Sequence, residues 1–216
     1  MPIIRTLAGV HIKVVMDGNS LTRGFNGASV NQYISNKITE YLTPLVGSVE
    51  MVSLGVDGQR LQTMVNNATA NIYSLVNPSK YNILIVNEDA NGIFQDDYSE
   101  FKNLQLMNQY ISGAYRSKFD AIISWNGWYA RTPFDLFIPT TDDLLRFKNY
   151  CDLANTEGKL YSNINVDMRL CANVGGAEGQ AQNSTYFNDY LHLKALGYDE
   201  VANRLITHGI NQLFTF

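Results

Sequence analysis

The sequence predicts an α/β protein: a three-layer α/β/α sandwich with a mainly parallel sheet, formed by one domain over residues 1–216. Short β-branched runs alternate with longer segments whose apolar residues recur at helical spacing. These longer segments can serve as right-handed crossovers, which place helices on both faces of a parallel sheet. A chain of 216 residues is also long enough to bury the core of such a sandwich.

The first two strands each precede a helix. Residues 11–16 (HIKVVM) are strand-like, and 29–42 carry apolar residues four positions apart, which form one stripe of a helix. Residues 48–54 (SVEMVSL) are again strand-like. Residues 60–76 have helical spacing until Asn77-Pro78 ends the pattern. We therefore expect strand, helix, strand and helix in this order.

The same unit repeats in the middle of the chain. Strands are expected at 81–87 (YNILIVN) and 120–125 (DAIISW), with a helix at 98–117 between them. A stretch that contains Gly and Pro residues follows from 126 to 140. The next segment, Thr140-Thr141-Asp142-Asp143, is typical of a helix N-terminus.

The last third contains a weak strand and a long helix. The strand is expected within KLYSNINV at 159–166, and the helix within 193–213. Gly197 lies inside the helical span, which predicts a break or a two-part element at this point.

Composition excludes several classes of protein. Hydrophobic residues make up 45% and charged residues 17%, as in a globular protein, and no segment reaches the roughly 18 apolar residues of a membrane span. The net charge is −4 and no Lys/Arg run occurs, so we expect no nucleic-acid partner. Cys151 and Cys171 form no CxxC pattern and are expected to be buried free thiols. We expect no metal and no cofactor.

Location and assembly are less constrained by the sequence. The opening 1–16 lacks an apolar stretch followed by a small-residue cleavage site, so no signal peptide is expected in the chain as given. The default expectation is cytoplasmic, with virion association or another export route left open. The oligomeric state is not predicted.

Polar residues cluster at the predicted strand ends, where ligands of parallel sheets bind. Ser20 follows the first strand, Gly58 the second and Asn91 the third, while Asp189 and His192 lie three residues apart near the C-terminus. Each alone has an ordinary structural interpretation as a cap, a turn residue or a surface histidine. Together they place a serine, an imidazole and a carboxylate at one edge.

Four short blocks carry a family resemblance. They are Gly18-Asn19-Ser20-Leu21, Gly55-Val56-Asp57-Gly58, Asp89-Ala90-Asn91-Gly92, and Asp189-Tyr190-Leu191-His192 with the Ala195-Leu196-Gly197-Tyr198 that follows. In this order they resemble the Ser, Gly, Asn and His blocks of the SGNH hydrolases, also called the GDSL esterase/lipase superfamily. The resemblance spans residues 14 to about 205 and implies a flavodoxin-like sheet.

The resemblance implies a role for each residue. Ser20 would be the nucleophile, His192 the general base and then acid, and Asp189 the group that orients the imidazole. The oxyanion hole would consist of the backbone N–H groups of Ser20 and Gly58 and the side-chain amide of Asn91. Gly58 suits this role because a residue without Cβ lets the oxyanion approach closely.

The blocks depart from the family pattern twice. Asn19 stands where the family usually has Asp, and either residue can cap the following helix. The third block usually reads Gly-x-Asn-Asp, whereas Asp89 and Gly92 flank Asn91 here. Asn87 is therefore an alternative to Asn91 as the amide donor.

By family analogy, the expected activity is hydrolysis of small acyl esters, with O-acetyl groups on a carbohydrate preferred. A lipid-chain esterase or thioesterase is one alternative. A non-catalytic carbohydrate-binding or virion-associated module on the same fold is another. The carboxylate pairs Glu88/Asp89 and Asp96/Asp97 also allow glycoside chemistry in principle, but solvated turn residues are the favoured interpretation of both.

An aromatic-rich loop follows the fourth strand. It contains Trp128, Tyr129, Arg131, Phe134 and Phe137. Two interpretations are equally favoured: these side chains, Trp128, Tyr129 and Arg131 in particular, bind the substrate, or the loop is a hydrophobic cover over the edge of the core.

Overall fold

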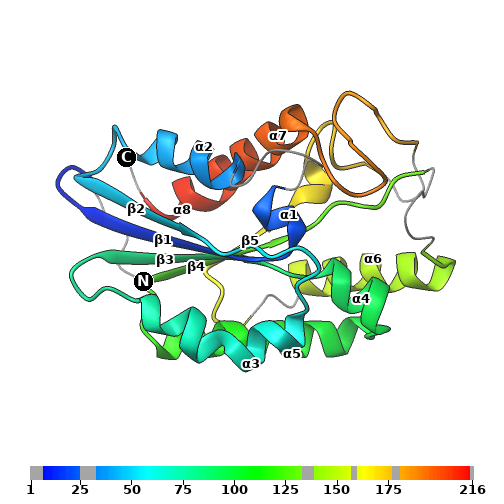
Figure 1. Ribbon diagram of the computed structural model, residues 1–216, viewed down its shortest axis with the longest axis horizontal. Helices are drawn as coiled ribbons and strands as arrows, with labels where there is room; N and C mark the ends of the chain where they lie inside the picture. Colours follow the sequence, from blue (N-terminus) through cyan, green and yellow to red (C-terminus); the bar gives the residue numbers. More distant parts are fainter. Residues whose placement is uncertain (1–6, 25–32, 133–138, 157–159, 177–180, 215–216) are drawn as a thin grey trace.

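A five-stranded parallel sheet forms the centre of the protein (Figure 1). The computed structural model describes residues 7–24, 33–132, 139–156, 160–176 and 181–214. The strands of these ranges lie in the order β2-β1-β3-β4-β5, and every neighbouring pair is parallel. This order is flavodoxin-like. The strands are β1 (His11–Gly18), β2 (Ser48–Ser53), β3 (Tyr81–Asn87), β4 (Ala121–Asn126) and β5 (Ile164–Asp167).

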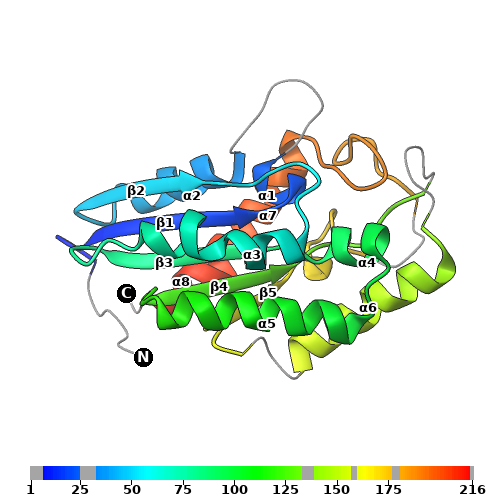
Figure 2. The same cartoon turned by 60° about the horizontal axis from the view of Figure 1, so that its bottom comes forward.

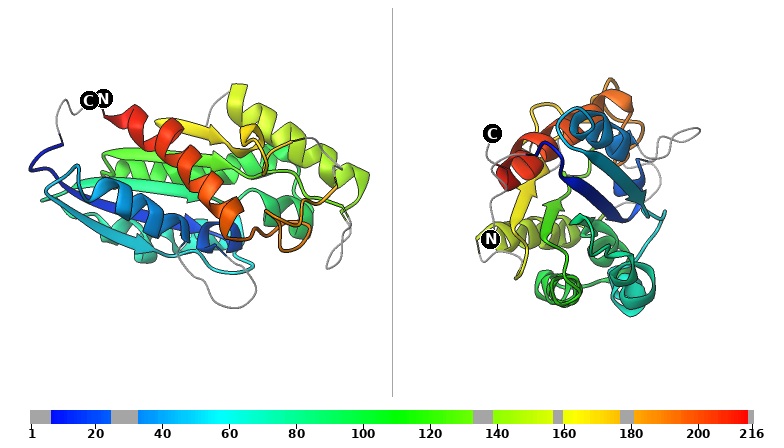
Figure 3. Two further views of the ribbon diagram at one scale, coloured as in Figure 1. Left: turned by 90° about the horizontal axis from the view of Figure 1, so that it is seen from above. Right: turned by 90° about the vertical axis from the view of Figure 1, so that its left-hand side faces the viewer.

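Helices cover both faces of the sheet, which confirms the predicted α/β/α sandwich (Figures 1 and 3). One face carries α1 (Ser20–Arg23), α2 (Tyr33–Leu42), α7 (Ala195–Leu205) and α8 (Asn211–Leu213). The other carries α3 (Leu61–Asn71), α4 (Ala90–Asp96), α5 (Glu100–Arg116) and α6 (Thr141–Thr156), which come forward in Figure 2.

The sequence of β1 is almost continuously apolar because both faces of this strand are buried. Ile12, Val14 and Met16 pack into the core beneath α2 and α7, whereas Val15 packs into the core formed with α3 and α5. All four side chains are fully buried. Because both faces are covered, a strand of this sheet reads as a hydrophobic run rather than an alternating pattern.

Most predicted elements are present near their predicted bounds. The third strand begins and ends where the sequence predicts, and the weak fifth strand is present as β5. The predicted cap of α6 is a reciprocal pair: Thr140 Oγ1 accepts from Asp143 N at 3.1 Å, and Asp143 Oδ2 accepts from Thr140 N at 2.8 Å. Both cysteines are free and buried, as predicted.

The predicted helical span at 193–213 does consist of more than one part, but the division does not lie at Gly197. Helix α7 continues through this residue, and the irregularity comes later, in a π-helical turn at Ile206–Ile210. Gly197 serves close packing instead, because a Cβ there would lie 2.7 Å from the Tyr186 carbonyl oxygen.

Helix α4 is not predicted from the sequence, which leaves 88–97 as a polar segment after a strand. Its residues ANGIFQD include Asn and Gly, which are weak helix formers, and Asp89 at its N-terminus makes no capping side-chain bond. The helix is held by packing, since Ile93 and Phe94 contact the buried face of α6. Among the helices of the described ranges, none has the length and apolar character needed to cross a bilayer.

Candidate active site

Ser20 is the first residue of α1, directly beyond the carboxyl end of β1. Asn19 caps this short helix, since its Oδ1 accepts from Leu21 N at 2.9 Å, so the departure from Asp preserves the capping bond. Gly18 lets the chain turn against β3, because a Cβ at this position would lie 2.1 Å from the Asn87 carbonyl oxygen. The Ser20 residue is mostly buried, at 9% exposure.

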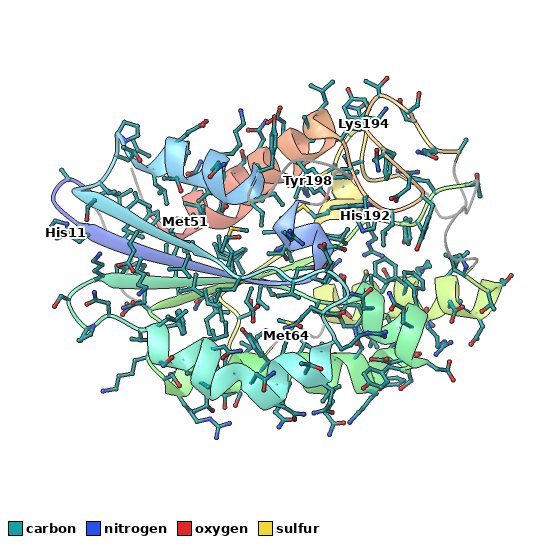
Figure 4. The ribbon with its side chains drawn as sticks, in the orientation of Figure 1. His11, Met51, Met64, His192, Lys194 and Tyr198 are labelled. Atoms are coloured by element: carbon teal, nitrogen blue, oxygen red, sulfur yellow. The ribbon has the colours of Figure 1, made fainter. Side chains whose placement is uncertain are left out.

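His192 and Asp189 lie in a turn just before α7. The backbone closes this turn through Asn188 N, which donates to the His192 carbonyl at 2.8 Å. Ser20 Oγ lies 3.0 Å from His192 Nε2, and His192 Nδ1 lies 2.8 Å from Asp189 Oδ2. Figure 4 shows His192 beside α1 at the carboxyl end of the strands, with His11 at the opposite end of β1.

The carboxylate of Asp189 determines the roles of the two ring nitrogens. Burial acts to raise the pKa of Asp189, but hydrogen bonds from the His192 ring and from the backbone N–H groups of His192 and Leu191 lower it overall. An ionised carboxylate only accepts, so Nδ1 must donate to it. Nε2 of the neutral imidazole is then an acceptor facing the Ser20 hydroxyl.

Gly58 lies in the segment after β2 and lines the same pocket as Ser20. Its φ of +69° is in the left-handed region, which favours glycine. A Cβ at this position would meet no protein atom within 4 Å, so the backbone conformation is the feature of the described structure that favours glycine here.

Asn91, and not Asn87, reaches the pocket. Asn91 lies on the unpredicted helix α4, and its Nδ2 donates to the Gln59 carbonyl at 2.9 Å. Asn87 is fully buried, and its Nδ2 donates to the Trp125 carbonyl at 3.0 Å and to Asp89 Oδ1 at 3.2 Å. The alternative donor is thus occupied within the core.

These residues surround a pocket of about 170 Å³. Carboxylate, amide, aromatic and aliphatic side chains line it together with Ser20 and His192. The remaining lining residues are Asp57, Gly58, Asn91, Gln95, Tyr190 and Leu191. Sequence reasoning did not single out Gln95 as a site residue; its spacing of four from Asn91 would have indicated it if 90–96 had been predicted as helical.

The described part of the aromatic-rich loop, residues 127–132, lies against the core. Trp128 is fully buried and its Nε1 donates to the Leu191 carbonyl at 2.8 Å. Arg131, at 2% exposure, donates to the Val174 carbonyl and lies over the Phe187 ring. Tyr129 packs against Phe147.

For residues 127–132 this arrangement supports the interpretation as a hydrophobic cover. Trp128, Tyr129 and Arg131 do not line the pocket, so the structure does not support them as substrate-binding residues. Phe134 and Phe137 lie outside the described residues.

The acidic pairs are not arranged for glycoside chemistry. Glu88 and Asp89 are fully buried, contrary to the expectation of solvated turn residues. Asp89 Oδ2 accepts from Gly127 N at 2.6 Å, and burial, with the charge of Asp89 next, raises the pKa of Glu88 well above its usual value. Asp96 forms an ion pair with Arg60, and Asp97 forms one with Arg146. Neither carboxylate lines the pocket that contains Ser20 and His192.

Comparisons with known proteins agree with this fold. No family model matches the chain, and neither does any curated protein. Solved structures do match. A GDSL-like lipase from Bacteroides thetaiotaomicron is similar over 93% of this chain and 88% of its own, with a TM-score of 0.69 and 17% identity.

Two further solved structures cover nearly the whole chain. A member of the lipolytic G-D-S-L family from Veillonella parvula covers 93% of this chain and 99% of its own, at a TM-score of 0.63 and 16% identity. A mutant of an acetyl-xylooligosaccharide esterase from Geobacillus covers 95% of this chain and 97% of its own, at a TM-score of 0.67 and 10% identity. The chain therefore has the fold of the SGNH hydrolases, as the four blocks imply.

Proposed function

We propose that this protein is a serine esterase that hydrolyses small acyl esters, with O-acetyl groups on a carbohydrate as the preferred substrate. The observation that carries the proposal is the continuous line of hydrogen bonds from the Ser20 hydroxyl through both His192 nitrogens to the Asp189 carboxylate. The fold alone would not support an activity, because one fold serves many functions.

In the proposed reaction, Ser20 Oγ attacks the ester carbonyl while His192 Nε2 takes the hydroxyl proton. The tetrahedral oxyanion would be bound by the backbone N–H groups of Ser20 and Gly58 and by the Asn91 amide. Protonated His192 then gives its proton to the leaving alcohol. Water, activated by the same nitrogen, cleaves the acyl-enzyme and restores Ser20.

The backbone donors suit this role. Neither the Ser20 nor the Gly58 N–H has a hydrogen-bond acceptor among the described residues. Ser20 begins α1, and the N–H groups of a first helical turn lack intrahelical partners. An oxyanion would supply the missing acceptor.

The pocket supports a short acyl group. Its volume of about 170 Å³ is below the roughly 300 Å³ at which pockets for drug-sized ligands begin. Tyr190 and Leu191 offer apolar contact, while Asp57 and Gln95 offer groups that can bond sugar hydroxyls. The similarity to an acetyl-xylooligosaccharide esterase adds an analogy and no more.

The proposal is tested with a fluorophosphonate probe and with p-nitrophenyl acetate and octanoate. We expect labelling at Ser20, mapped by mass, and hydrolysis of acetate well above octanoate. Ser20→Ala and His192→Ala should each lower kcat by about 10³-fold or more. The control His11→Ala, at the far end of β1, should retain full activity.

Other outcomes identify the alternatives. Faster hydrolysis of octanoate or of an acyl thioester would indicate a lipid-chain esterase or thioesterase. Equal residual rates in wild type, Ser20→Ala and His192→Ala would refute the esterase proposal and favour a non-catalytic binding module.

A further inference from the structure

The amide of Asn91 can serve an oxyanion only in one of its two orientations. Its Nδ2 donates, whereas its Oδ1 would repel a developing negative charge. The two orientations have nearly the same shape, so packing does not choose between them. Hydrogen-bond partners must make the choice.

Two partners hold the Asn91 amide in the donating orientation. The Gln59 backbone carbonyl, which can only accept, lies 2.9 Å from Nδ2, and Gln95 Nε2 donates to Oδ1 at 2.7 Å. One of the two Nδ2 hydrogens is used by Gln59. The other has no acceptor among the described residues, and Asn91 lines the pocket.

We propose that Gln95 is a positioning residue, which fixes the Asn91 amide with an N–H available to the oxyanion; this inference rests on the proposed function. Gln95 and Asn91 are four residues apart on α4, on one face of the helix. Helix α4 thus supplies a partner for Asn91 from its own next turn.

Gln95 can be replaced without loss of the helix. Its side chain is exposed. Helix α4 is tied to the start of α3 independently, because Arg60 Nη1 lies 2.6 Å from Asp96 Oδ1. We therefore do not expect a loss of activity on replacing Gln95 to result from unfolding.

The test is a double-mutant cycle with Gln95→Met and Asn91→Ala on p-nitrophenyl acetate. Gln95→Met has neither the donor nor a new charge, and we expect kcat to fall about 3- to 10-fold with KM unchanged, a fraction of the roughly 10²-fold cost of deleting an oxyanion donor. Asn91→Ala should lower kcat by that larger factor. The double variant should be no slower than Asn91→Ala alone.

A matched control is present on α3, where Gln62 Nε2 donates to Asn66 Oδ1 at 3.1 Å at the same spacing of four residues. Gln62→Met should leave kcat unchanged. If the losses of Gln95→Met and Asn91→Ala multiply, or if Gln95→Met raises KM alone, Gln95 acts by contact with substrate and the positioning role is overturned.

A second measurement separates this inference from the proposed function. The side-chain amide protons of Asn91, assigned by their loss in Asn91→Ala, should exchange faster with water in Gln95→Met but not in Gln62→Met. If exchange is faster in Gln95→Met although the wild type hydrolyses no ester, the esterase proposal is refuted and the positioning role is kept. Unchanged exchange in an active enzyme would refute the positioning role.

Discussion

At the scale of single residues, Asp17 shows most clearly how burial changes the pKa of a carboxyl group. It lies at the carboxyl end of β1 at 4% exposure, and its Oδ2 accepts from the Tyr110 hydroxyl at 2.6 Å. Burial is the largest effect and raises the pKa of Asp17 to about 6, while the bonds from Tyr110 and Gly18 act to lower it. In the folded state its neutral form therefore persists up to about pH 6.

This raised pKa predicts a pH dependence of stability. Between pH 4 and 6 the folded chain retains a proton that the unfolded chain releases, so stability falls as pH rises through this window. From pH 4 to 7 we expect wild type to lose about 2 kcal/mol more unfolding free energy than Asp17→Asn, since each unit of pKa shift is worth 1.36 kcal/mol and the unfolded carboxyl is already partly ionised at pH 4. Urea unfolding at four pH values measures the difference.

The control for this prediction is Gln62→Met, which changes no titratable group. Its stability curve should run parallel to that of wild type. A parallel curve for Asp17→Asn as well would mean that Asp17 does not titrate with the expected shift.

At the scale of elements, α1 has four residues and carries the proposed nucleophile. So short a helix has little stability of its own, and its cap therefore matters. Asn19→Ala should lower the unfolding free energy by about 1 kcal/mol, whereas Asn19→Asp, which keeps an acceptor oxygen, should lose less. Urea unfolding measures the loss of unfolding free energy in each variant, and the rate of fluorophosphonate labelling measures the effect of the cap on Ser20. Equal losses of unfolding free energy in the two variants would contradict the role of the cap.

Elements also differ in how far the sequence predicts them. Strands β1, β3 and β4 are hydrophobic runs bounded by polar residues, and such runs can be predicted from the sequence. Helix α4 cannot be predicted in this way, because Asn91 and Gly92 are poor helix formers and its stability comes from the packing of Ile93 and Phe94 against α6.

At the scale of the whole molecule, the site depends on contacts between segments far apart in the chain. Trp128 Nε1 donates to the Leu191 carbonyl, and Arg131 N donates to the Tyr190 carbonyl at 2.7 Å. Both carbonyls belong to the turn between Asp189 and His192. The loop after β4 therefore supports the turn that holds the imidazole.

Replacing Trp128 should affect both stability and activity. Trp128→Phe leaves the Leu191 carbonyl without its donor, which should lower the unfolding free energy by about 1–3 kcal/mol and lower kcat by loosening the turn. Trp125→Phe is the matched control, since Trp125 stacks on Trp128 at 6.2 Å between ring centroids. It should lower stability with kcat unchanged; an equal fall of kcat in both variants would indicate a general loss of packing.

The sequence by itself determined the alternation of the five strands with the longer helices and the edge at which Ser20, Gly58 and Asn91 lie. It could do so because periodicity and strand-to-helix junctions are local properties, and parallel strands end at a common edge. Tertiary structure decided the formation of α4, the choice of Asn91 over Asn87, the burial of Trp128 and Arg131, and the shifted pKa of Asp17. Each of these depends on groups far away in the chain, whose packing and hydrogen bonds no local pattern records.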